Sequence, residues 1–169
     1  MKEIDFQNDL LPLKNKLYRL AQRITLDSLE AEDVVEDTLV RVWERRRMLS
    51  EVENLEVYCT TICRNLALDR AERKDAQHTA LDDSLNATAD TAALPDAQLE
   101  ADERLKWVRR SFEKLPEKQR TALQLRDIDG HTYQEVATAM NISESDVKVT
   151  LHRARQTLKD MLSHLKFHL

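Results

Sequence analysis

The sequence predicts an all-α protein, with two small helical domains joined by an acidic linker. Only one Gly and three Pro occur among 169 residues, which leaves little material for the turns of a sheet. Long stretches are instead filled with Leu, Ala, Glu, Arg and Gln, which are good helix formers. A chain of this length fits one ordinary domain or two small ones, so the division depends on the pattern along the chain.

The segment Asp75–Asp102 divides the chain by its charge. It holds seven of the 31 acidic residues and none of the 26 Lys and Arg residues, so the rest of the chain is close to neutral despite a net charge of −5. The segment has scattered single Leu residues and no aromatic residue, and it buries too little apolar area to offset its ordering entropy. We predict a domain over 1–75, a flexible linker over 76–102, helical towards its end, and a domain over 103–169.

Three helices are expected in the first domain, because apolar residues recur at three- and four-residue steps. Asp27 or Ser28 can cap the second helix, and Glu30 has the spacing of a capping box with Asp27. The apolar positions are, in order, Leu10, Leu13, Leu17, Leu20 and Ile24; Val35, Leu39 and Val42; and Leu55, Tyr58, Cys59, Ile62 and Leu66.

The second domain begins with a helical stripe and ends with two closely spaced helix starts. Pro116 suits the first turn of a helix, and Gly130 breaks the chain. Thr132 with Glu135 and Ser143 with Asp146 both match the capping-box spacing. The stripe before Pro116 consists of Leu105, Val108, Phe112 and Leu115.

The helix starts expected at Thr132 and Ser143 predict a helix-turn-helix, in which the second helix enters the major groove of DNA. Ala137 is small enough for the two helices to cross closely, and Asn141 tolerates the left-handed conformation of the turn. The second helix is cationic, as contacts to phosphates and base edges require, through Lys148, His152, Arg153, Arg155 and Lys159. The alternative is a helical hairpin with a solvated basic face.

Two stretches together resemble one known family. LPEKQRTALQLRDIDGHTYQEVATAMNISESDVKVTLHRAR is similar to the promoter-binding C-terminal domain of extracytoplasmic-function sigma factors. EAEDVVEDTLVRVWERR followed by VYCTTICRNLALDRAERK resembles the N-terminal domain of the same subgroup. The resemblance implies a transcription initiation factor with no cofactor, whose partners are core RNA polymerase, promoter DNA and an anti-sigma factor.

The resemblance implies that Glu32–Arg47 docks on the clamp helices of the polymerase largest subunit. An acidic helix start would suit a basic partner, although acids also favour the positive end of a helix dipole. The candidate polymerase contacts are Glu32, Asp33, Glu36, Asp37 and Arg41.

By the same resemblance, the third helix captures and melts the minus-ten promoter region, and the loop Met48–Asn54 forms a pocket for a flipped base. The aromatic position is Tyr58, which either stacks on an unpaired base or packs in the core. The candidate minus-ten contacts are Asn54, Tyr58, Thr61, Arg64, Asn65, Arg70, Arg73 and Lys74.

The recognition helix departs from the family, in which many members carry Ser-Arg where this chain has Val149-Thr150. Thr offers a hydroxyl and Val a methyl contact to thymine. Arg126 and Tyr133 match positions that hold the DNA backbone, and both also suit a structural role. The candidate minus-thirty-five contacts are Arg126, Tyr133, Lys148, Val149, Thr150, His152, Arg153 and Arg155.

Other functions have less support in the sequence. Cys59 and Cys63 form no disulfide framework or zinc pattern, and we expect them in the core. No histidine has catalytic or metal spacing and no Gly-rich phosphate loop occurs, so we expect no enzyme and no metal. No apolar run could cross a bilayer, which predicts a cytoplasmic protein without membrane insertion. The competing function is a two-domain helix-turn-helix regulator that does not bind polymerase.

The seven acidic residues of Asp75–Asp102 are more than a passive tether between two domains requires, since Gly and Ser would serve equally well. By the resemblance, this connector passes through basic channels of the polymerase, so we predict that it mimics nucleic acid in the RNA path. The alternative is that the charges keep an exposed chain soluble and extended.

Overall fold

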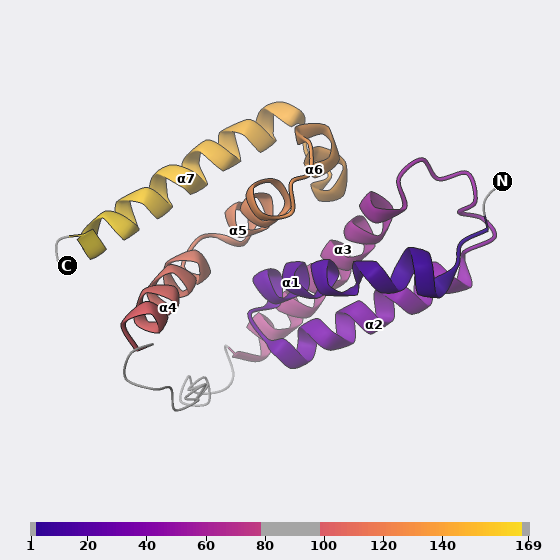
Figure 1. The fold of residues 1–169 in the computed structure, drawn as a ribbon, viewed down its shortest axis with the longest axis horizontal. Coiled ribbons are helices and arrows are strands. Elements are labelled where there is room, and N and C mark those ends of the chain that lie inside the picture. Colours follow the sequence, from indigo (N-terminus) through magenta and orange to yellow (C-terminus); the bar gives the residue numbers. More distant parts are fainter. Residues whose placement is uncertain (1–2, 79–98, 167–169) are drawn as a thin grey trace.

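The computed structural model describes residues 3–78 and 99–166, and within these ranges every regular element is helical. The predicted all-α class is therefore confirmed (Figure 1). The first part holds a π-helical turn and a 3-10 turn followed by three α-helices: Phe6–Leu10, Leu11–Leu13, α1 Lys14–Thr25, α2 Ser28–Glu44 and α3 Leu55–His78. The second part holds α4 Leu99–Glu113, α5 Glu117–Leu123, the π-helical segment Gln124–Ile128, α6 Tyr133–Met140 and α7 Glu144–Lys166.

The junction between α1 and α2 follows the predicted capping chemistry in part. α1 ends at Leu26, whose φ of 56° is left-handed, and the Asp27 carboxylate accepts the backbone N–H groups of Leu29 and Glu30 at 3.0 and 3.3 Å. Glu30 does not return to the cap, because its carboxylate accepts a hydrogen bond from Arg70 of α3. Asp27 therefore caps the start of α2, but Glu30 does not complete a capping box and instead binds Arg70 of α3.

The three N-terminal helices enclose one apolar core. The two thiols lie in it, and burial raises the pKa of Cys59 and of Cys63 to about 12. The prediction that they are core residues is confirmed. The apolar stripes of α1 and α2 supply the opposing surface through Leu17, Leu20, Ile24, Val35, Leu39 and Val42.

The C-terminal helices are interrupted at Pro116 and Gly130, as the sequence predicts. Pro116 precedes the first residue of α5 as its N-cap, and Gly130 adopts a φ of +78°, which favours glycine. The expected stripe of α4 is only half correct: Phe112 and Leu115 are buried, whereas Leu105 is 60% and Val108 40% exposed. α4 thus leaves the apolar side chains of Leu105 and Val108 exposed to solvent.

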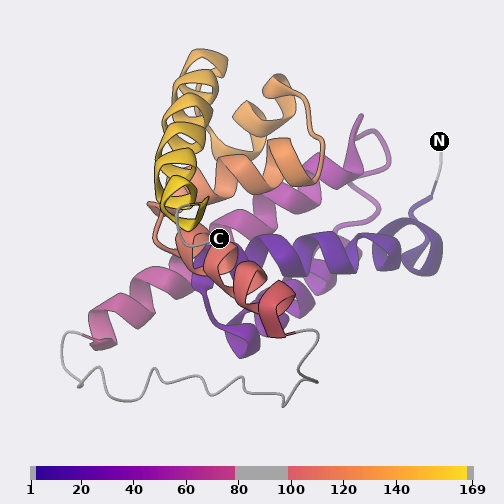
Figure 2. The ribbon, with the colours of Figure 1, turned by 60° about the vertical axis from the view of Figure 1, so that its left-hand side comes forward.

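The two parts of the chain pack against each other (Figures 1 and 2). α6 lies beside α3, and α5 lies beside α1. Residues 79–98, the middle of the predicted acidic linker, lie outside the described residues; α3 continues to His78 and α4 begins at Leu99. No helix in the described ranges is long and apolar enough to span a membrane.

Candidate nucleic-acid interface

The predicted helix-turn-helix is formed by α6, a tight turn and α7. Thr132 and Glu135 make the full capping box at the start of α6, and backbone hydrogen bonding holds the pKa of Glu135 below its usual range. Asn141 ends α6 with φ 55° and ψ 49°, as expected for the turn. The backbone N–H of Asp146 donates to the Ser143 hydroxyl at 3.0 Å, which caps the start of α7.

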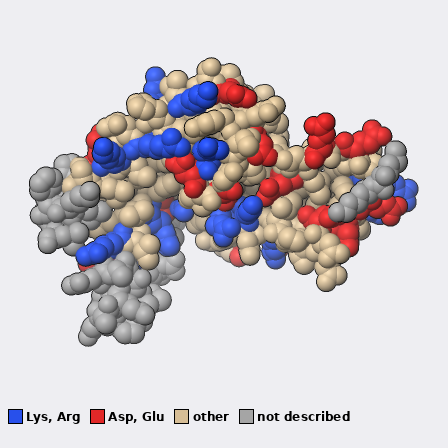
Figure 3. Space-filling model, turned by 45° about the horizontal axis from the view of Figure 1, so that its top comes forward, with Lys and Arg blue, Asp and Glu red and all other residues tan. Residues whose placement is uncertain are grey.

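One side of α7 is fixed in the core, so the opposite side must face outwards. α6 packs against α7, and Val136 and Met140 of α6 and Val147 and Leu151 of α7 are all buried in the core. The exposed residues on the first turns of α7 include four predicted contacts: Lys148, Val149, His152 and Arg153. In Figure 3, Lys and Arg side chains form a band over the C-terminal helices, whereas acidic side chains gather towards the N-terminal helices.

Thr150 does not share this exposed face. It is only 5% exposed, and its hydroxyl donates to the Asp146 carboxylate at 3.2 Å. That carboxylate also accepts from Lys118 of α5 at 2.9 Å, which lowers the pKa of Asp146. The Thr150 hydroxyl therefore binds the carboxylate of Asp146, which joins α7 to α5 through Lys118.

Arg126, in the π-helical segment, lies against Tyr133, the first residue of α6. The Arg126 guanidinium is 4.4 Å from the centre of the Tyr133 ring, and the Lys148 ammonium is 5.6 Å from it. Arg126 also donates to the carbonyl of His131 at 2.8 Å. These contacts give Arg126 and Tyr133 a structural role, and they hold Lys148 beside two further DNA-contact candidates.

Arg155 forms an ion pair with Asp127. Its guanidinium donates to both carboxylate oxygens of Asp127 at 3.0 and 2.6 Å, and this interaction raises the pKa of Arg155. The pair ties α7 to the π-helical segment before Gly130. A contact to DNA would have to compete with it.

The start of α3 borders a groove of about 520 Å³. Asn54, Tyr58 and Thr61 line one wall, and Tyr58 also packs partly against the core. Residues of α6 line the other wall, namely Gln134, Glu135 and Thr138. The groove therefore lies between the two parts of the chain, and three predicted minus-ten residues lie within it.

Further along α3, Arg64 and Asn65 are neighbours in space as well as in sequence. The Arg64 guanidinium donates to the side-chain oxygen of Asn65 at 3.3 Å. Asn65 is exposed and Arg64 half-buried. Asn65 is therefore accessible to a partner, and Arg64 is partly so.

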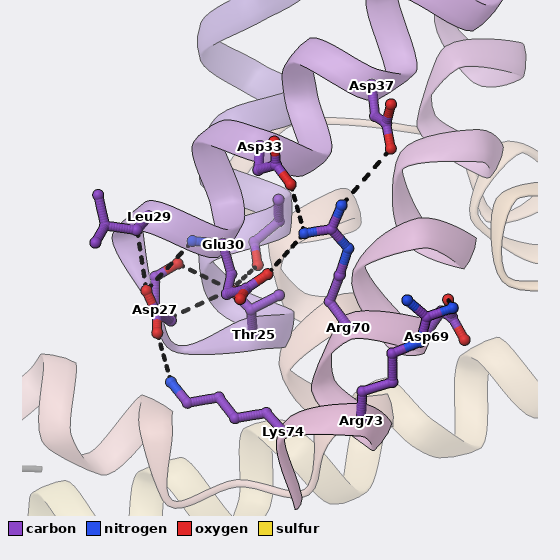
Figure 4. A network of polar contacts seen from close by, with 11 residues as sticks. Thr25, Asp27, Leu29, Glu30, Asp33, Asp37, Asp69, Arg70, Arg73 and Lys74 are labelled. Carbon is purple, nitrogen blue, oxygen red and sulfur yellow. Dashed lines mark hydrogen bonds and ion pairs between the residues drawn. The ribbon is translucent and has the colours of Figure 1, made fainter. Parts of the chain in front are cut away.

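The three cations at the end of α3 all contact carboxylates (Figure 4). Arg70 lies 2.9, 2.5 and 3.7 Å from the carboxylates of Glu30, Asp33 and Asp37 of α2, and its hydrogen bond to Glu30 raises its pKa. Lys74 lies 2.5 Å from Asp27, and Arg73 lies 3.0 Å from Asp69 one turn away. We call the contacts of Arg70 and Lys74 the α2–α3 ion network.

The predicted polymerase contacts on α2 fall on two sides of that helix. Asp33 and Asp37 face Arg70. Glu32 and Glu36 are exposed and line a polar groove of about 410 Å³ with Lys14, Asn15, Tyr18 and Val35. Arg41 is exposed further along α2. The sequence did not separate these two sides.

Three residues that the sequence analysis did not single out join the two parts of the chain. Arg120 of α5 donates to the carbonyls of Arg23 and Ile24 at the end of α1, at 2.7 and 3.3 Å. Arg23 donates to the side chain of Gln124 at 3.0 Å. These pairs are separated by about a hundred positions, so no local pattern could have revealed them.

Family models match both parts of the chain in the expected order. "Sigma-70 region 2" matches residues 12–77, and "Sigma-70, region 4" matches residues 105–158. The ECF RNA polymerase sigma factor SigM of Bacillus subtilis is 30% identical over 146 residues, which cover 86% of this chain and 87% of that protein. The chain belongs to the extracytoplasmic-function subgroup of the sigma-70 family. A sigma factor binds core RNA polymerase and directs promoter recognition and transcription initiation, and it is not an enzyme.

Two further relatives of this sigma factor differ in length and in context. The ECF sigma factor SigE of Mycolicibacterium smegmatis is 29% identical over 151 residues, which cover 88% of this chain but 58% of SigE. The sigma factor RpoE of Bartonella quintana, solved in complex with the anti-sigma factor NepR, has the same fold. The match has a TM-score of 0.74 and 23% identity and covers 94% of this chain and 97% of RpoE.

Proposed function

We propose that this sigma factor divides its work between residues 1–75, which bind core polymerase and the minus-ten region, and residues 103–169, which bind the minus-thirty-five region. The observation that carries the proposal is the exposed cationic face of α7 beyond a fully capped helix-turn-helix. Four side chains on this face can reach the major groove: Lys148, Val149, His152 and Arg153. Arg126, Tyr133 and Arg155 support the helix and add contacts to the DNA backbone.

The minus-ten contacts fall into two groups. Asn54, Tyr58 and Thr61 line the groove at the start of α3, and its half-buried aromatic wall suits an unpaired base. Arg64 and Asn65 extend this surface along the helix. Arg70, Arg73 and Lys74 lie beyond it and are paired with carboxylates, so their contribution to DNA binding is smaller.

The proposed polymerase contact is the exposed side of α2 with Glu32, Glu36 and Arg41. Asp33 and Asp37 are less suited, because Arg70 already neutralises them. Changing them would break the α2–α3 ion network as well as any docking contact.

An anti-sigma factor in the cytoplasm is the proposed regulatory partner. α4 exposes Leu105 and Val108 beside a groove of about 350 Å³ that Phe112, Leu123 and Leu158 also line. An exposed apolar groove of this kind is typical of a protein-binding surface. RpoE, which shares the fold, was solved with such a partner.

The test compares two double variants in a pull-down with core polymerase and in transcription from a set of promoter fragments. Glu32→Lys with Glu36→Lys should weaken retention by core polymerase at least tenfold while helix content stays unchanged. Asp33→Asn with Asp37→Asn, on the other side of α2, should lower stability through the α2–α3 ion network but keep retention close to that of the wild type. Equal retention of both variants and the wild type would refute the docking surface.

A further inference from the structure

We propose that Phe6, in the segment that precedes α1, is a positioning residue for minus-ten recognition. Through Trp43 and Arg46 it fixes residues 45–54, which connect α2 to α3, and so sets which base the groove at the start of α3 prefers. The proposal rests on the minus-ten function proposed for that groove. The segment lies beside the end of α2, where the connection begins (Figure 1).

The connection between α2 and α3 needs support from side chains, because little of it is buried. Within residues 45–54, all of which the structure describes, Leu49 is the one buried side chain. The backbone forms successive short turns, in which the N–H groups of Met48, Leu49 and Val52 donate to the carbonyl three residues earlier, at 2.9, 3.2 and 3.1 Å. Such turns have poorer hydrogen-bond geometry than an α-helix. Their position therefore depends on how firmly the first turn is held to the end of α2.

Arg46 holds the first turn to Trp43. Its backbone N–H donates to the carbonyl of Trp43 at 3.2 Å, and its guanidinium donates to the same carbonyl at 2.9 Å. The guanidinium also lies 4.1 Å from the centre of the Trp43 ring, which is a favourable distance for a cation–π interaction. Trp43 is thus the point on α2 to which the connection is anchored.

Phe6 supports the ring of Trp43. The centres of the two rings are 5.6 Å apart and their planes are at 84°, which is a favoured edge-to-face arrangement. Phe6 is itself held in place, because the Asp5 carboxylate caps its turn by accepting the N–H of Gln7 at 3.1 Å and Leu10 at the end of the turn is fully buried. Both rings are half-buried, so the pair lies at the edge of the core, where it orients the ring that Arg46 contacts.

The turns lead directly into the groove, which Val52, Glu53 and Asn54 help to line. A binding site discriminates between ligands when its contacting groups are held within about half an ångström of the productive geometry. A shift at Arg46 would displace this wall of the groove, whereas the rest of α3 is fixed by its buried face. Phe6 therefore acts on base preference without lining the groove itself.

The test uses holoenzyme assembled from the full chain and core polymerase. The probe is a pool of short duplexes whose single-stranded non-template overhang is randomised at every position, and sequencing of the captured DNA gives the base preference along the overhang. We expect Phe6→Ala to lower the wild-type preference at least about fivefold at one position or at two adjacent positions, with the other positions unchanged. Phe6→Tyr keeps the ring and should restore the wild-type profile.

Three further variants separate positioning from stability and charge. Arg46→Met removes both side-chain contacts to Trp43 and should reproduce the altered profile. Arg45→Met removes the same charge from the exposed neighbouring arginine and should keep the wild-type profile. Leu13→Ala truncates another half-buried side chain that packs against the core. It should lower the unfolding temperature as Phe6→Ala does, with the profile unchanged.

A folded Phe6→Ala variant with the wild-type profile would overturn the positioning role. Phe6→Ala and Leu13→Ala variants that lower capture equally at every position would do the same, since that result shows a loss of stability only. If Phe6→Ala does not fold, Arg46→Met and Arg45→Met decide the question, and equal profiles reject the proposal. A wild-type holoenzyme that captures the pool without any base preference rejects the minus-ten function of the groove as well, whereas a selective wild type with unchanged variants rejects this inference alone.

Discussion

The cations of α3 and those of α7 look alike in the sequence but have different surroundings. Arg70 and Lys74 of α3 hold the α2–α3 ion network together (Figure 4). Lys148, His152 and Arg153 of α7 are exposed, and within the described ranges none of them forms an ion pair with a carboxylate. A cation that already neutralises carboxylates must give up that interaction to bind a phosphate. The same residue types thus stabilise the fold in one helix and are available to DNA in the other.

The largest expected effect is on α7. If Arg153 reads a base, Arg153→Ala should cost about 1–3 kcal/mol at one promoter position, because nothing in the fold compensates for the lost contact. Binding to a set of promoter variants by gel shift measures this. Arg155→Ala is the contrast. Arg155 is paired with Asp127 and is proposed to contact the DNA backbone, so its loss should lower the affinity for all promoter variants by about the same factor. If both variants show the same profile across sequences, the distinction between exposed and paired cations on α7 is wrong.

The next effect is on stability and belongs to α3. Arg70→Ala leaves three carboxylates of α2 without their cation. Because these carboxylates are 37–57% exposed, solvent screens them, and we expect a loss of about 1–2 kcal/mol in urea unfolding. Arg73→Ala removes an exposed pair within one helix and should cost less than about 0.5 kcal/mol. Equal losses would show that the network adds nothing beyond a single surface pair.

The smallest effect concerns the pH dependence of the same network. The hydrogen bond from Lys74 holds the pKa of Asp27 below its ordinary value. The stability from this ionised carboxylate is therefore present above about pH 4 and is lost as the pH falls through the lower, folded-state pKa. Asp27→Asn keeps a good helix cap but removes the charge. It should cost about 0.5–1 kcal/mol at neutral pH and nothing in acid; a difference that persists in acid would assign the loss to the cap.

The sequence predicted the parts of the fold that depend on neighbouring residues. The helix-turn-helix, its capping box and the left-handed Asn141 follow from signals within about twenty positions. The burial of Thr150 was also within reach, because it lies three residues after Val147 and four before Ala154, on the buried stripe of α7. Its polar side chain led to its assignment as a DNA contact.

Features that depend on distant residues were not predictable in this way. The two sides of α2 differ because Arg70, more than thirty positions away, selects Asp33 and Asp37 but not Glu32. Leu105 and Val108 show the opposite case, in which the sequence predicts burial but the side chains are exposed. A periodic apolar stripe predicts a helix and a buried face, but here the described residues cover only half of the stripe of α4.

Among the described residues, Arg120 donates to carbonyl oxygens and to no carboxylate, so its contacts respond differently to ionic strength from contacts between charged groups. Salt weakens contacts between exposed charges, and DNA binding falls steeply as salt rises because counterions are released. A buried guanidinium held by neutral oxygens is screened much less. Rising salt would therefore release this sigma factor from DNA while leaving the hydrogen bonds of Arg120 in place, so the ionic composition of the cell acts on one set of contacts and spares the other.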